Sequence, residues 1–317
     1  MDRSVLPRQL LLGASLLTAT VLAGLPTTAG SAQTIFFTEN FDYTNFAARG
    51  WYDTSGGTVD SANHIPGSTA SFNCRWVQGG TKCAGGAPGR HLFTASPTVY
   101  VSFWIKLGSA AVTWRGSGQS YHPHMIYLLT DADDEYVGPA WCNLEFLIEP
   151  ALFTPRLAAT DGKRINTGQL GVNLLGTTTP HAIGGGNGSQ NASSGHYSNG
   201  DGTYSNATLW DSPSANFVNN TWHRVEVYVA MNSIAGGIPQ ADGIIKLWVD
   251  GALVVNRSNA YLRTAQFATQ KFNQFLLAPY IGDGSPIAQD LWIDNLVVAD
   301  QPPSSSSVPA PTNLRVQ

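Results

Sequence analysis

The sequence predicts an all-β fold, and three observations carry the prediction. Segments in which apolar and polar residues alternate recur along the chain, and this period of two indicates strands with one face on a core. No segment longer than about twelve residues shows the 3.6-residue period of an amphipathic helix. The chain contains 33 glycines, and charged residues are only 12% of it. This composition is typical of an extracellular β domain with many turns.

The first 32 residues have the features of a secretory signal peptide. Arg3 and Arg8 precede an apolar run over residues 10–25, and small residues at 30–32 follow it. We therefore expect cleavage after Ala32 and a secreted protein, and the short leader is typical of bacteria. The apolar run is too short and broken to be a good membrane span, and no later segment approaches 18 apolar residues.

Residues 33–300 are expected to form one β-sandwich domain, followed by a Pro/Ser-rich linker tail at 301–317. The net charge of −4 argues against general nucleic-acid binding. Cys74 and Cys83 flank a glycine-containing loop, so we expect a disulfide between them, which export permits. Cys142 is interpreted as a buried thiol. The sequence suggests no organic cofactor and gives no indication of oligomeric state.

Seven segments have the alternation expected of strands. They are residues 99–107, 124–130, 143–149, 223–231, 244–255, 272–282 and 291–300. Within the fifth segment, Asp250-Gly251 predicts a two-residue hairpin turn. Residues 176–221 are dominated by Gly, Ser, Asn and Thr, which predicts a long polar loop rather than core structure.

Residues 222–299 carry three recognisable motifs, "WHRVEVYV", "DGIIKLWVDG" and "LWIDNLVV". Together they resemble the closing half of concanavalin A-like jelly-roll domains, as in bacterial polysaccharide lyases of the heparin-lyase and alginate-lyase type. The resemblance implies a jelly-roll β-sandwich of two antiparallel sheets, in which the opening segment "TENFD" (38–42) pairs beside the last strand. Lyases, hydrolases and lectins share this ending, so it specifies architecture better than chemistry.

The same resemblance implies a structural Ca²⁺ ion that bridges the first and last strands. Carried over to this sequence, its ligands would be Glu39, Asp42 and Asp294, whose hard oxygen atoms suit calcium. The alternative is that Asp42 and Asp294 accept hydrogen bonds from turn amides.

The segment "NLEFLIE" (143–149) places Asn143, Glu145 and Glu149 on one face of its strand. It resembles the Glu-x-Asp-x-Glu motif of laminarinase-type retaining β-glucanases, but Leu147 replaces the middle aspartate. Four residues of extended chain separate Cα atoms by about 13 Å. Retaining hydrolysis requires carboxyl groups about 5–5.5 Å apart, so this alternative requires a bulge or strong curvature.

A lyase that acts on a uronate must neutralise its carboxyl group and supply a base and an acid. The segment "WRGSGQSYHPHMIY" (114–127) concentrates the required residue types, although it lacks the "R-T-E-L-R" and "Q-I-H" signatures of alginate lyases. We expect Asn143 or Arg115 to act at the carboxyl group. His122 or His124 would be the base, and Tyr121 or Tyr127 the acid. Glu145 and Glu149 would orient these groups. The histidines could instead cap backbone carbonyls, or bind a transition metal with Glu145.

Tyr100, Trp104 and Lys106 share the polar face of residues 99–107, and with Gln119 they are expected to stack on and hydrogen-bond sugar rings. Half-buried aromatics beneath a loop would give the same pattern. The sequence therefore favours a secreted lyase that cleaves a uronate-containing polysaccharide by β-elimination. A retaining glycoside hydrolase that uses Glu145 and Glu149 and a non-catalytic lectin-like module are the alternatives.

Overall fold

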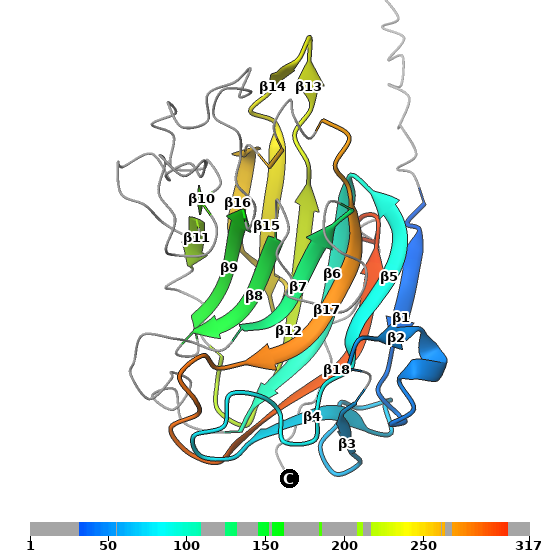
Figure 1. The fold of residues 1–317 in the computed structure, drawn as a ribbon, viewed down its shortest axis with the longest axis vertical. Helices are drawn as coiled ribbons and strands as arrows, with labels where there is room; N and C mark the ends of the chain where they lie inside the picture. Colours follow the sequence, from blue (N-terminus) through cyan, green and yellow to red (C-terminus); the bar gives the residue numbers. More distant parts are fainter. Residues whose placement is uncertain are drawn as a thin grey trace, which may run out of the picture. The chain divides into compact units, whose positions relative to one another are not determined.

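The structure is a computed structural model, and residues 32–317 are one of the two units into which the chain divides. Figure 1 shows the strands of this unit. It describes residues 32–54, 56–108, 124–131, 145–151, 154–161, 184–185, 208–211, 217–260, 262–263 and 268–303. Residues 1–31 of the expected signal peptide (1–32) and nearly all of the predicted tail lie outside these ranges. The predicted domain boundaries therefore stay predictions.

The described residues form β-strands and one short 3₁₀ turn, η1 (Ala47–Arg49), which confirms the all-β prediction. Two eight-stranded sheets contain nearly all of the strands. A separate two-stranded ribbon consists of β13 (Ile234–Ala235) and β14 (Ile238–Pro239). In the described part of the chain, no helix is long and apolar enough to cross a membrane.

Sheet A has the strand order β16-β15-β12-β6-β18-β4-β3, and β1 also pairs with β18. Its strands are β1 (Ile35–Glu39), β3 (Thr58–Asp60), β4 (Ser71–Trp76), β6 (Thr98–Leu107), β12 (Trp222–Ala230), β15 (Gly243–Val249), β16 (Ala252–Ala260) and β18 (Gln289–Ala299). Every pairing in this sheet is antiparallel. The resemblance implied that the first strand pairs beside the last, and β1 does so.

Sheet B has the order β10-β9-β8-β7-β17-β5-β2, with β11 paired to β9. Its strands are β2 (Trp51–Tyr52), β5 (Gly89–Ser96), β7 (His124–Thr130), β8 (Glu145–Ala151), β9 (Thr154–Asp161), β10 (Gly184–Gly185), β11 (Thr208–Asp211) and β17 (Phe272–Tyr280). The pairings are antiparallel except for the short β9–β10 contact.

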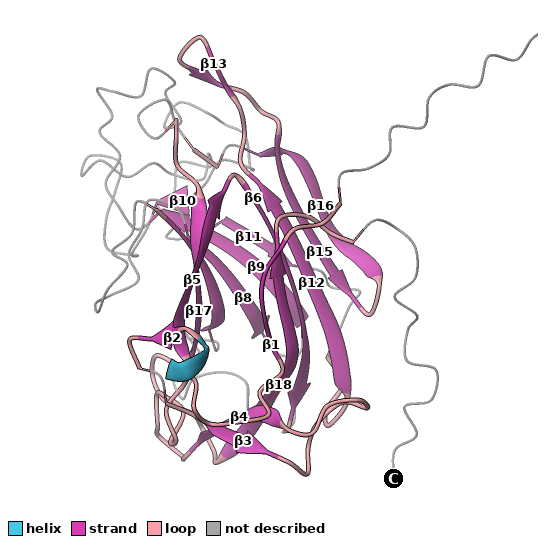
Figure 2. Cartoon of the chain, turned by 90° about the vertical axis from the view of Figure 1, so that its right-hand side faces the viewer, coloured by secondary structure: helices cyan, strands magenta, loops and turns pink. Residues whose placement is uncertain are grey.

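The two sheets lie face to face with one apolar core between them. In sheet A, alternate residues of β6 such as Val101 and Phe103 enter this core, and in sheet B, Leu128 and Phe275 enter it from the opposite side. Figure 2 shows β5, β17, β8 and β9 on one side of the sandwich, with β1, β18, β12 and β15 on the other. Each sheet therefore has an inner face on the core and an outer face directed away from it.

The predicted strands are confirmed, with boundaries that shift by a few residues. The segment predicted over 244–255 is two strands, β15 and β16, joined at the expected Asp250-Gly251 turn. Both turn residues have positive φ values, 50° and 80°, as a tight hairpin of this type requires. The sequence did not predict β4 or β5.

The expected Cys74–Cys83 disulfide is present. It closes a short loop that leaves β4 and lies against the chain after β17. Within this loop, Lys82 forms an isolated antiparallel bridge with Tyr280 at the end of β17. Cys142 lies outside the described residues.

Candidate functional site

The outer face of sheet B brings together candidate acid and base residues. On β7 and β17, Leu128 and Phe275 face the core, whereas Leu129 and Leu276 form a separate cluster against which Tyr127 packs. Strand alternation puts this second cluster on the face away from the core. Tyr127 therefore lies on the outer face of sheet B.

His124 and Tyr280 lie opposite each other where β7 pairs with β17. The register shifts between Leu277 and Tyr280, so that three residues of β17 oppose two of β7, which is the pattern of a β-bulge. The rings of His124 and Tyr127 lie 6.4 Å apart between centroids, with an interplanar angle of 23°. Tyr280 is 36% exposed. This irregularity gathers an imidazole and two phenols at one end of the strands.

Arg90 lies deeper on the same face, and it is fully buried. It pairs in register with Leu276, which also pairs with Tyr127. Its Nε atom is 3.2 Å from Asp53 Oδ2, and its Nη1 group donates a 3.2 Å hydrogen bond to Gln274 Oε1. Because its charge is paired in the interior, Arg90 fixes β5 against β17 rather than presenting a free cation.

Several sequence-predicted residues lie outside the described ones: Arg115, Gln119, Tyr121, His122 and Asn143. For Glu145 and Glu149 the structure describes the backbone of β8 but not the side chains. Leu147, between them, pairs with Tyr127 of β7. The β8–β9 register runs without a shift from Glu145 to Ala151. The register thus keeps these glutamates on a strand adjacent to His124 and Tyr127.

The predicted sugar-binding residues Tyr100, Trp104 and Lys106 lie on β6, in sheet A. Their neighbours Val101 and Phe103 face the core, so all three belong to the outer face of sheet A. The structure therefore does not bring them together with His124 and Tyr127, because the whole sandwich lies between the two outer faces. One groove cannot contain both sets.

Tyr100 is engaged by neighbouring side chains on sheet A. It is 2% exposed, and its hydroxyl donates a 2.5 Å hydrogen bond to Glu226 Oε1. The Arg224 Nη2 group is 3.1 Å from the same carboxylate oxygen. Burial raises the pKa of Tyr100, and the hydrogen bond to Glu226 raises it further.

Lys106 and Trp104 belong to an aromatic cluster on the same face. Lys106 Nζ lies 4.6 Å from the ring centroid of Trp292 and donates a hydrogen bond to Asn63 Oδ1. Burial lowers the pKa of Lys106. Trp104 packs against Trp222 and Trp292. These contacts match the alternative to sugar binding, namely half-buried aromatics packed beneath a loop.

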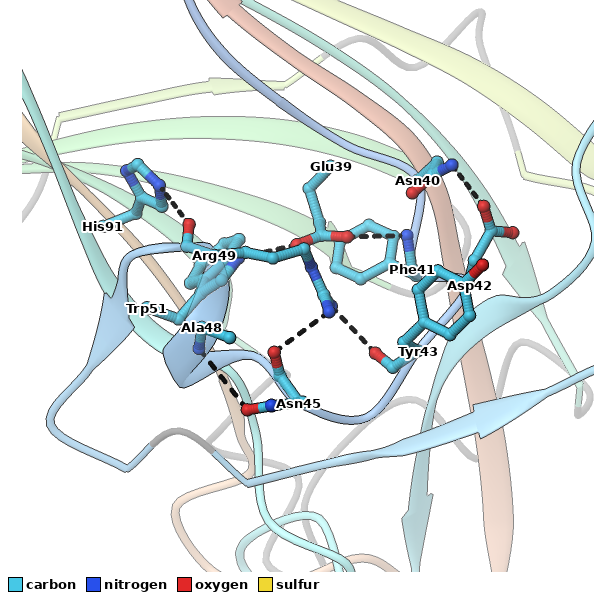
Figure 3. A network of polar contacts seen from close by, with 10 residues as sticks. All are labelled: Glu39, Asn40, Phe41, Asp42, Tyr43, Asn45, Ala48, Arg49, Trp51 and His91. Atoms are coloured by element: carbon cyan, nitrogen blue, oxygen red, sulfur yellow. Dashed lines mark hydrogen bonds and ion pairs between the residues drawn. The ribbon is translucent and has the colours of Figure 1, made fainter.

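Figure 3 shows the surroundings of Glu39, one of the three expected calcium ligands. Glu39 is 3% exposed. Its carboxylate accepts hydrogen bonds from Arg49 Nε at 2.7 Å and from Trp51 Nε1 and the Phe41 amide at 2.8 Å each. All three neighbours are donors, and one is a cation, so they take up three of the roughly four acceptor positions of the carboxylate.

Asp42 and Asp294 are also engaged by hydrogen-bond donors. The hydroxyl of Thr69 donates to Asp42, and Asp294 accepts from the Ile65 amide at 2.9 Å and from Ser68 Oγ at 3.1 Å. Burial raises the pKa of Asp294. Among the described residues, no three His, Cys, Asp or Glu side chains are grouped to hold a metal. In this arrangement the three residues do not fit a Ca²⁺ site, and calcium binding stays a prediction.

Arg90, Gln274 and Tyr280 were not among the site residues predicted from the sequence. Arg90 and Gln274 are buried polar residues, and their partners come from distant parts of the chain. Tyr280 ends a strand that was predicted correctly. The bulge that aligns it with His124 cannot be recognised from the alternation of apolar and polar residues. The sequence signal that could have indicated these residues was the presence of a polar residue on an otherwise apolar strand.

Comparisons with known proteins place the fold rather than a sequence family. No family model and no curated protein matches the sequence. The chain is similar in structure to the marine alginate lyase from Aplysia kurodai, with a TM-score of 0.50 and 10% identity over 84% of this chain and 98% of that one.

Two further solved structures have TM-scores of 0.49. They are the endo-β-1,4-glucuronan lyase of the fungus Trichoderma reesei, with 16% identity over 84% of this chain and 96% of that one, and an alginate lyase from Chlorella virus, with 13% identity over 84% and 100%. The likeness to the Aplysia kurodai structure confirms the predicted jelly-roll β-sandwich of two antiparallel sheets at the level of the fold.

Proposed function

We propose that this protein is a secreted polysaccharide lyase that cleaves a uronate-containing glycan by β-elimination. The observation that carries the proposal is the row formed by His124 and Tyr280 on paired strands, with Tyr127 stacked beside His124. Imidazole and phenol groups are the side chains that can take up and deliver protons in such a reaction.

The reaction assigns a distinct role to each residue. His124 removes the proton from the carbon next to the uronate carboxyl group, and the released electron pair forms a carbon–carbon double bond. The glycosidic carbon–oxygen bond breaks, and Tyr280 donates its proton to the departing oxygen. Tyr127 orients the His124 ring, while Arg115 or Asn143 neutralises the carboxyl group at the reacting sugar.

Two further observations support the proposal, one on the substrate and one on export. The fold is shared with the Aplysia kurodai protein, an alginate lyase, and alginate is a polyuronate. The Cys74–Cys83 disulfide is also compatible with an exported enzyme.

The hydrolase alternative depends on bringing Glu145 and Glu149 together. The β8–β9 pairing contains no register shift between these residues, so the described backbone lacks the bulge that would shorten their separation. The lectin alternative depends on the aromatic row of β6. Because those side chains are mostly engaged by sheet A neighbours, the row supports a binding role less well than the sequence pattern suggested.

The test is to incubate the purified protein with a panel of uronate-containing and neutral polysaccharides. Ultraviolet absorbance, which reports the new double bond, and reducing ends are recorded together. A rise in both on a uronate-containing substrate is the expected result. Reducing ends without absorbance would overturn the proposal in favour of a hydrolase, and silence across the panel accompanied by binding would favour a lectin-like module.

A further inference from the structure

The disulfide loop is docked on the chain that follows β17. The Gly79 amide donates to Ser285 O at 2.7 Å, and the Ser285 amide donates to Gly80 O at 2.9 Å. The Ile281 amide donates to Thr81 O, also at 2.9 Å. Gly284 has a φ of +89°, and a Cβ atom there would lie 2.6 Å from Gly79 O. Backbone contact this close fixes the loop against the end of β17.

The bridge between Lys82 and Tyr280 extends the candidate site by one residue. In an antiparallel bridge, directly opposed side chains point to the same face of the sheet. Lys82 and Tyr280 are both exposed, whereas the neighbouring Cys83 and Ile281 are buried. Lys82, Tyr280 and His124 therefore form one cross-strand row on the outer face of sheet B.

The order of this row matches the order of groups along a sugar chain. If the reacting carbon lies at His124 and the departing oxygen at Tyr280, the chain continues over Lys82. Neighbouring strands are about 4.8 Å apart, so the lysine lies within reach of the next sugar. An exposed ammonium group at this point attracts a carboxylate.

We propose that Lys82 binds the uronate carboxylate on the leaving-group side of the scissile bond, and that the Cys74–Cys83 disulfide is the device that positions it. The inference rests on the proposed function and deepens it. Lys82 makes the site selective for anionic chains without taking part in proton transfer. Since Cys74 belongs to β4 in sheet A, the disulfide ties the lysine loop to the opposite sheet.

The first test removes the charge. Lys82→Gln is expected to raise KM for a polyuronate about tenfold, equivalent to about 1.4 kcal/mol of binding, while kcat changes little because uniform binding is lost. Lys82→Arg should restore most of the affinity. Lys246→Gln, on β15 of sheet A, is the matched control and should leave KM unchanged. Added salt should raise the KM of the wild-type enzyme more than the KM of Lys82→Gln.

The second test asks whether the disulfide acts through the lysine. Cys74→Ala/Cys83→Ala should raise KM to a similar extent, and adding Lys82→Gln to that variant should raise it little further. Such non-additivity is the mark of two groups that act as one unit. Far-ultraviolet circular dichroism checks that the sandwich remains folded. Should the cysteine variant not fold, Lys82→Gln and Lys82→Arg still decide the role of Lys82.

The outcomes separate this inference from the proposed function. A wild-type protein that produces no ultraviolet-absorbing ends from any uronate substrate contradicts the proposed function itself. An active wild type with the same KM and salt dependence in Lys82→Gln contradicts the role of Lys82 alone. Additive effects of the cysteine and lysine changes would show that the disulfide does not act through Lys82.

Discussion

The outer faces of the two sheets contain similar residue types but use them differently. On sheet A, Tyr100, Glu226 and Arg224 are bonded to one another, and Lys106 lies over Trp292. On sheet B, the cross-strand row of Lys82, Tyr280 and His124 contains two exposed residues, Tyr280 and Lys82. Residue type alone therefore does not identify a site, because a tyrosine or a lysine can complete a local network, as on sheet A, or face solvent, as on sheet B.

The largest expected effect is on the chemistry of sheet B. His124→Ala should lower kcat by about 10²–10⁴ because the base is lost, with little change in the thermal midpoint. Initial rates from ultraviolet absorbance measure kcat, and circular dichroism reports the fold. Lys246→Gln serves as the control. A kcat equal to that of the wild type would place the base elsewhere.

A large effect on stability is expected below the same face. Arg90→Met should lower the free energy of unfolding by about 3–5 kcal/mol, since it leaves the Asp53 carboxylate without its buried partner. Denaturant unfolding gives this value. Adding Asp53→Asn should recover part of the loss, because it removes the unpaired carboxylate charge. Asparagine also tolerates the positive φ of 79° at this position. Equal stability of Arg90→Met and the wild type would contradict the pairing.

A smaller effect is expected on sheet A. Tyr100→Phe should cost about 1–2 kcal/mol of stability through the lost hydrogen bond to Glu226, with kcat and KM unchanged. The folded pKa of Tyr100 is raised, so the native state keeps a proton that the unfolded chain releases above about pH 10. Stability is therefore lost as pH rises from about 10 towards the raised pKa of the folded state, and more steeply in the wild type than in Tyr100→Phe. Urea unfolding at neutral and alkaline pH measures the difference, and equal slopes would contradict the shift.

The smallest effect on activity is expected at Trp104. Trp104→Phe keeps an aromatic ring in the cluster with Trp222 and Trp292, so KM for the polysaccharide should stay at the wild-type value. KM is measured by substrate titration of Trp104→Phe and Lys82→Gln in parallel. A KM that rises in Trp104→Phe and not in Lys82→Gln would reverse the comparison between the two faces.

The strands with regular alternation could be predicted from the sequence, and so could the hairpin and the disulfide. Alternation tells which residues of β6 share a face, but not that β6 pairs with β12, more than a hundred residues away. Tertiary pairing therefore assigned Tyr100 and Trp104 to sheet A, on the opposite side of the sandwich from His124.

The strand β5 shows why the rest could not be predicted. Arg90 is fully buried on one face, and on the other His91 stacks on Phe37 with ring centroids 3.8 Å apart. Polar residues on both faces hide the period-two pattern. The burial of Arg90 is stabilised by Asp53 and Gln274, partners that sequence spacing does not reveal.

The most direct test of the account is a crystal structure of His124→Ala with a short oligouronate, since this variant should bind the substrate without cleaving it. We expect sugar density across the outer face of sheet B, with the Tyr280 hydroxyl at the glycosidic oxygen and Lys82 at the next carboxylate. Density across Trp104 on sheet A, with sheet B empty, would contradict it.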